Sequence, residues 1–150
     1  MRLLGHPLHA ILVAFPLALL SLTPLWDALA WAGIAGAHWV AYLGMIAGLC
    51  IGVLAVLTGF IDFVRAEKSA AVETVALWHA GCALTALCIF AVALVLRSAD
   101  HTATGWALAV EAVGAIGIGI TGWFGGHLVF HHGVAVSGAT SGKVSSGKPS

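Results

Sequence analysis

Histidine is the residue type in this chain best suited to chemistry, and six of the eight histidines are expected at one end of a helical bundle. Neutral imidazole binds zinc, copper, iron and nickel ions, and it is a common axial ligand of haem iron. An imidazole in or near lipid is costly unless it has a partner, so each one is a functional candidate. The six are His6, His9, His79, His127, His131 and His132.

Two charged residues are expected in the same layer as these histidines. Asp62 lies three residues before Arg65, so it either ligates a metal, orients a ligating imidazole or pairs with Arg65. Arg65 is placed to bind haem propionates, anionic lipid or a carboxylate. The expected haem-binding set is His6, His9, His79, His132 and Arg65, and the expected metal-ligand set is His79, Asp62, His6, His9, His127 and His131. The alternative for most of these residues is an ordinary position among lipid headgroups.

The composition indicates an integral membrane protein. Of the 150 residues, 61% are hydrophobic and 8% are charged, whereas about a quarter of the residues in a soluble domain are charged. The mean hydropathy is +1.05. The formal net charge is zero, which gives no indication of nucleic-acid binding. Nothing indicates a hydrolase, because the chain has no GxSxG motif and no nucleophile beside a base.

Four apolar segments predict an all-α fold, an integral membrane four-helix bundle. They cover residues 9–29, 39–64, 74–96 and 104–129, and each exceeds the roughly 20 residues needed to cross a bilayer core. Residues 1–136 are expected to form this transmembrane domain. Residues 137–150 are rich in glycine, serine and lysine and are expected to form a disordered tail.

Basic residues predict the orientation of the bundle. With four spans, the N-terminus, the loop at 65–73 and the C-terminal tail share one side, which carries every lysine and arginine except Arg97. Because positive charge favours the cytoplasmic side, both termini are expected in the cytoplasm. Pro7 suits the first turn of a helix, which would place His6 and His9 on one helix face. His127 and His131 share a face if the fourth helix continues past two glycines.

A second polar group is expected towards the opposite side of the membrane. Glu111 lies about seven residues into the fourth span, so it should face the bundle interior and either pair with His38 or line a proton path. Asp27 is expected at the membrane interface. His101 completes this group, whose role the sequence leaves open.

A stripe of small residues marks a close helix contact on the second span. Gly44, Gly48 and Gly52 recur every four residues, so another helix can approach closely there. The pattern fits a contact within the chain and a contact in a homodimer equally well.

Several motifs together resemble the domain-of-unknown-function 2231 family. They are Gly5-His6-Pro7-Leu8-His9, Phe15-Pro16, the segment 58–63 with Asp62, His79, and the segment 122–134 with its terminal histidines. The family consists of small predicted bacterial membrane proteins, typically with four spans, and the resemblance covers residues 5–136. It implies a multi-pass protein of the bacterial inner (plasma) membrane. It supports His6, His9, Asp62, His79 and His132, whereas the family pattern has glutamate where His127 stands. It implies no reaction.

Three functions are compatible with these residues. The leading one is a small electron-transfer protein that binds haem b or a transition-metal ion near the cytoplasmic face. His79 would be one ligand and His6, His9 or His132 the other, because imidazoles on facing helices can clamp iron within a bundle. Its partner would be quinone or another membrane redox protein. The alternatives are a non-catalytic membrane subunit or assembly factor, and proton or metal-ion transport by an oligomer along Asp62, His79 and Glu111.

Overall fold

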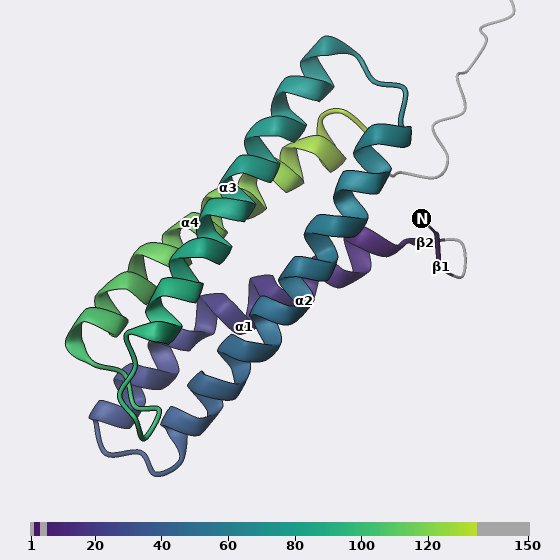
Figure 1. Cartoon of the computed structure of the whole chain (residues 1–150). Helices are drawn as coiled ribbons and strands as arrows, with labels where there is room; N and C mark the ends of the chain where they lie inside the picture. Colours follow the sequence, from purple (N-terminus) through teal and green to yellow (C-terminus); the bar gives the residue numbers. More distant parts are fainter. Residues whose placement is uncertain (1, 4–5, 135–150) are drawn as a thin grey trace, which may run out of the picture.

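Four long helices make up almost all of the described structure, a computed structural model that describes residues 2–3 and 6–134 (Figure 1). The helices are α1 (Leu8–Trp31), α2 (Ala37–Arg65), α3 (Ala70–Val95) and α4 (Gly105–Phe130). Each is long and apolar enough to cross a membrane, which confirms the expected all-α, membrane-spanning four-helix bundle. The tail expected at 137–150 lies outside the described residues.

Local capping sets where the helices begin. The α3 helix starts at Ala70, four residues earlier than expected, because the Ser69 hydroxyl accepts a hydrogen bond from the Val72 amide at 3.4 Å. The expected span began after Glu73, the charged residue of this first turn. Thr104 caps α4 in the same way by accepting from the Ala107 amide at 3.1 Å.

The chain before α1 is extended, which corrects one expectation. Two short strands, β1 (Arg2–Leu3) and β2 (His6–Pro7), pair antiparallel before the helix begins. A residue that precedes proline is disfavoured in the helical region, and His6 precedes Pro7. The prediction that His6 and His9 share a helix face is therefore wrong.

The helices alternate in direction, with α1 alongside α2 and α3 alongside α4 (Figure 1). The starts of α1 and α3 and the ends of α2 and α4 gather at one end of the bundle, here called the histidine end. The loops at 32–36 and 96–104 form the other end, here called the loop end. Between the two ends lies a buried apolar core of Leu20, Met45, Ala86, Leu87, Phe90, Ala93 and Ile118. Which membrane side the histidine end faces stays a prediction.

Large apolar side chains cover the outside of the bundle. Val95 is 82% exposed, Trp106 is 78% exposed and Phe130 is 91% exposed. Such a surface would drive aggregation in water, whereas lipid tails solvate it at no cost. A lipid bilayer is the environment that this surface requires.

The glycine stripe on α2 makes its contacts within the chain. A Cβ at Gly48 would lie 2.7 Å from Leu20 Cδ2, and a Cβ at Gly52 would lie 2.6 Å from Leu87 Cδ2. Both glycines are buried. The sequence pattern fitted either a contact within the chain or a homodimer contact. A homodimer that packs through this stripe would have to displace Leu20 and Leu87.

We predict that Gly48→Ala lowers the free energy of unfolding by about 1–3 kcal/mol, because the added methyl overpacks the contact with Leu20. The measurement is thermal or denaturant unfolding in detergent. Gly119→Ala is the matched control, since no atom lies within 4 Å of its Cβ position. The control should keep or slightly raise stability, because alanine favours helix by about 1 kcal/mol over glycine. Equal loss in both variants would contradict the packing described.

Candidate functional site

Two histidines on different helices face each other near the histidine end. His9 lies in the first turn of α1 and His79 lies on α3, with ring centroids 6.2 Å apart and ring planes at 89°. His9 Nδ1 lies 2.7 Å from the carbonyl oxygen of Ala55 on α2. His79 Nδ1 lies 3.0 Å from the carbonyl oxygen of Thr121 on α4. All four helices therefore position this pair of imidazoles.

The carbonyl partners determine the tautomer of both rings. A carbonyl oxygen only accepts hydrogen bonds, so each Nδ1 must carry the proton and donate it. In the neutral ring, Nε2 then carries the free lone pair, and within residues 8–134 neither Nε2 has a hydrogen-bond partner. Histidines that bind metals almost always donate their other N–H to such an acceptor. Both rings thus make, through Nδ1, the kind of hydrogen bond that metal-binding histidines commonly make.

Two glycines allow these rings to lie against neighbouring backbones. A Cβ at Gly59 on α2 would lie 2.8 Å from both Cε1 and Nδ1 of His9. A Cβ at Gly125 on α4 would lie 3.1 Å from Cε1 of His79. Sequence reasoning missed the role of both glycines, although each stands inside a motif that it had singled out. Their packing fixes where the imidazoles sit.

A small cavity of about 50 Å³ lies beside the two rings, lined by residues of all four helices. Apart from the imidazoles its walls are mainly apolar, and they include Val13, Val56 and Ile118. One water occupies about 30 Å³, whereas pockets for drug-sized ligands begin near 300 Å³. The cavity therefore has room for an ion or a water and not for a macrocycle.

Those of the other expected ligands whose side chains the structure describes do not complete this pair. Asp62 is half-buried one turn beyond Gly59, and Arg65 is exposed at the end of α2. Among the described residues, no group of three or more histidine, cysteine, aspartate or glutamate side chains is arranged to hold a metal ion. The side chain of His6 lies outside the description. A centre built from the described residues would thus have two protein ligands.

The histidines at the end of α4 form a second group. The helix continues through Gly125 and Gly126, so the rings of His127 and His131 stack with centroids 4.7 Å apart. The His132 ring lies 5.2 Å from His127 and 5.6 Å from His131. His127 and His131 also line a surface cavity of about 360 Å³ together with Trp123 and Phe130.

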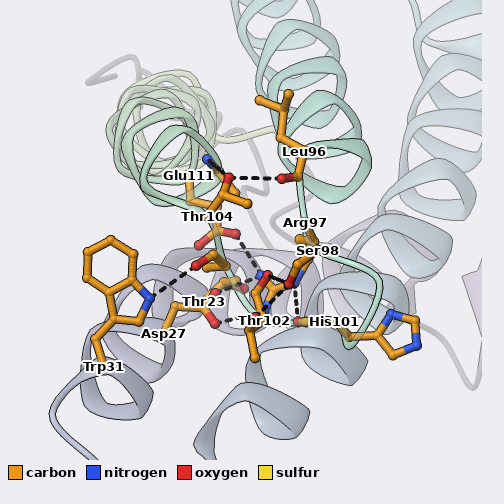
Figure 2. Close-up of polar contacts among 12 residues, drawn as sticks. Thr23, Asp27, Trp31, Leu96, Arg97, Ser98, His101, Thr102, Thr104 and Glu111 are labelled. Atoms are coloured by element: carbon orange, nitrogen blue, oxygen red, sulfur yellow. Dashed lines mark hydrogen bonds and ion pairs between the residues drawn. The ribbon is translucent and has the colours of Figure 1, made fainter.

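The loop end holds a buried ion-pair network around Arg97 (Figure 2). Arg97 Nη1 donates to Asp27 at 2.7 Å and to Glu111 at 2.8 Å, while Nη2 donates to the other Asp27 oxygen at 2.7 Å. Its Nε donates to the His101 carbonyl at 2.8 Å. Burial lowers the pKa of Arg97, but the hydrogen bonds and charges of Asp27 and Glu111 outweigh it, and the net pKa is raised. The guanidinium stays charged and joins α1, the 96–104 loop and α4.

A comparison with known protein families shows the family to which this chain belongs. The family model described as "predicted membrane protein (DUF2231)" matches residues 5–138. The chain belongs to the DUF2231 family. Comparison with curated proteins and with solved structures gives no match. The DUF2231 match includes both facing histidines and all three members of the Arg97 network, and it adds no reaction to them.

Within this DUF2231 fold, the loop end corrects one expectation. Glu111 pairs with Arg97 and not with His38, and Asp27, expected at the membrane interface, is fully buried against Arg97. His38 packs beside Trp39, with ring centroids 5.5 Å apart. Sequence reasoning used Arg97 only to orient the spans. The sequence signal for the network was a pair of acidic residues within apolar spans, Asp27 and Glu111, expected at the same end as Arg97.

Proposed function

We propose that His9 and His79 are the two protein ligands of one transition-metal centre, and that this centre carries electrons within the membrane. The supporting observation is the pair of Nδ1–H donors held by carbonyl oxygens, which leaves both Nε2 atoms available. A metal–imidazole bond is about 2.0–2.1 Å long, so one ion between two opposed rings keeps their centroids roughly 6 Å apart. The 6.2 Å centroid separation is close to this value, and it supports the proposal for rings whose Nε2 atoms both face the gap.

The metal of this centre is either iron held in haem or a bare ion. Haem would need only two ligands from the protein, and His9 and His79 would supply them. A bare redox-active ion such as copper prefers square-planar or tetragonal coordination, so with two imidazoles it would recruit water or a small anion. The cavity of about 50 Å³ favours an ion. Haem would require the α1–α2 pair to separate from the α3–α4 pair, and Arg65 at the same end would then pair with a propionate.

The surface cavity on α4 supports quinone as the electron partner. Imidazole N–H groups of His127 and His131 can donate to quinone carbonyls, and Trp123, which is 75% exposed, offers a stacking surface. The volume of about 360 Å³ is sufficient for a headgroup. Both histidine groups lie towards the same end of the bundle.

Transport receives less support from this geometry. The expected path joins His79 to Glu111, but the buried layer between the two ends consists of apolar residues. Glu111 is also held by Arg97. The other alternative is a non-catalytic membrane subunit or assembly factor. The metal content of the purified protein distinguishes it from a metal protein.

The test is to purify the protein from membranes in detergent, record visible spectra of the oxidised and reduced forms, and measure bound metals by mass spectrometry. A Soret band with one iron per chain would establish haem, and stoichiometric metal without that band would establish a bare ion. A colourless, metal-free protein would overturn the proposal. Co-purification of a stoichiometric partner with that metal-free protein would favour a non-catalytic subunit.

We predict that Gly59→Ala weakens metal binding by about 10–100-fold, the range typical of changes to groups that orient a ligand. The added methyl would lie 2.8 Å from the His9 ring and must displace it, although no ligand is removed. A competition titration with a chelator measures the affinity. Gly81→Ala is the matched control, because nothing lies within 4 Å of its Cβ position on α3. Unchanged affinity in Gly59→Ala would count against His9 as a ligand.

A further inference from the structure

The Arg97 network contains one more acid than base. Asp27 and Glu111 are fully buried, and the Arg97 side chain is 2% exposed. If all three groups were ionised, the buried network would carry a net charge of −1. An uncompensated buried charge costs several kcal/mol even after the protein relaxes, so the network needs a further positive charge.

One atom of the network has no partner. Glu111 Oε2 is the single buried side-chain nitrogen or oxygen without a hydrogen bond in the part of the chain that the structure describes. A buried carboxylate oxygen without a donor is strongly unfavourable. A proton on this oxygen would remove the charge and turn the atom into a donor.

We propose that the network binds one proton on Glu111, so that Asp27, Arg97 and protonated Glu111 form a neutral proton-binding site at the loop end. Two carboxyl groups that share one buried site commonly hold a single proton between them. The protonated Glu111 then donates to the carboxylate of Asp27, whose oxygens can each accept a second hydrogen bond besides the one from Arg97. The ligand of this site is a proton, separate from the metal proposed for the histidine end.

The hydrogen bonds assign the proton to Glu111 and not to Asp27. Both oxygens of Asp27 accept from Arg97 in a bidentate pair, at 2.7 Å each, which is the geometry of an ionised carboxylate. Glu111 accepts one hydrogen bond, through Oε1 from Nη1 at 2.8 Å, and Nη1 also donates to Asp27. Glu111 accepts fewer hydrogen bonds from the guanidinium than Asp27 does, so Glu111 is the carboxyl that keeps the proton.

Other titratable groups at the loop end have their own partners. His101 stacks on Tyr42 of α2 with ring centroids 4.1 Å apart, and His38 lies beside Trp39. Asp100 is exposed, and hydrogen bonds from Ser98 and Thr102 lower its pKa. None of these groups pairs with Glu111, and within the described residues Arg97 is the cation that faces it.

The 96–104 loop closes the site against water. Trp31 Nε1 on α1 donates to the Ala103 carbonyl at 3.1 Å, and Thr104 Oγ1 donates to the Leu96 carbonyl at 2.9 Å (Figure 2). These bonds attach the loop to α1 and to the end of α3. Because the loop covers the network, solvent does not compensate the extra negative charge and the proton must do so.

Infrared spectroscopy of the full chain in detergent or lipid at neutral pH tests the proposal. The C=O stretch of a protonated carboxylic acid is expected, shifted to lower frequency when the glutamate side-chain carboxyl is labelled with carbon-13. Glu111 is one of three glutamates, and the other two, Glu67 and Glu73, are exposed. The band should disappear in Glu111→Gln and persist in Asp100→Asn, which removes an exposed carboxylate of the same loop.

The isotope label keeps the experiment decisive if a variant fails to fold. Absence of a protonated carboxylic acid band from the wild-type protein would overturn the proposal. A band that shifts with labelled aspartate and not with labelled glutamate would place the proton on Asp27 and overturn the assignment. A band that survives in folded Glu111→Gln would do the same.

Discussion

Replacing His79 by asparagine is expected to abolish metal binding while the bundle stays folded. The amide nitrogen of asparagine can take the place of Nδ1 and donate to the Thr121 carbonyl. Asparagine has no atom equivalent to Nε2, so one of two protein ligands is lost. The affinity should fall by more than the roughly 100-fold that marks the upper range for changes around a ligand.

The measurement is metal content per chain together with thermal unfolding in the same detergent. His38→Asn is the matched control, because His38 is half-buried at the loop end beside Trp39. It should retain the wild-type metal content. Equal metal content in His79→Asn and His38→Asn would show that His79 is not a ligand.

Replacing Arg97 by methionine should destabilise the protein by about 3–5 kcal/mol, the range for removing one partner from a buried ion pair. The substitution leaves Asp27 without either of its two guanidinium bonds and removes the partner of Glu111 Oε1. It also releases the His101 carbonyl from Arg97 Nε. Equilibrium unfolding in detergent measures the loss.

A cycle of variants separates the charge effect from lost packing. Adding Asp27→Asn and Glu111→Gln to Arg97→Met should recover most of the stability, because no uncompensated charge then remains buried. Arg65→Met removes an exposed arginine at the other end and should cost less than about 1 kcal/mol. If Arg97→Met cost no more than Arg65→Met, the buried network would not stabilise the fold.

The fold could be predicted because the bilayer imposes strong rules on sequence. A span needs about 20 apolar residues, and the four expected segments coincide with the four helices except at their ends. The ends depend on caps such as Ser69 and Thr104, which hydropathy does not measure. The extended conformation of His6 followed from the proline after it, a local rule that the helical reading of Pro7 overlooked.

The site could be predicted only in part. His9 and His79 were expected as ligands because their type and depth are visible in the sequence. The carbonyl oxygens that hold their Nδ1 atoms depend on how α2 and α4 are rotated about their axes, which spacing alone does not fix. The role of Arg97 depends on how the 96–104 loop packs against α1 and α4. A residue in a loop is ordinarily exposed, and this one is buried.

X-ray absorption at the edge of the bound metal tests the central claim most directly, because it counts the imidazole nitrogens around that metal. The arrangement of His9 and His79 predicts two imidazole ligands in the wild-type protein and one or none in His79→Asn. A protein without bound metal, or a metal with no imidazole ligand or with three or more, would contradict a two-histidine centre between α1 and α3.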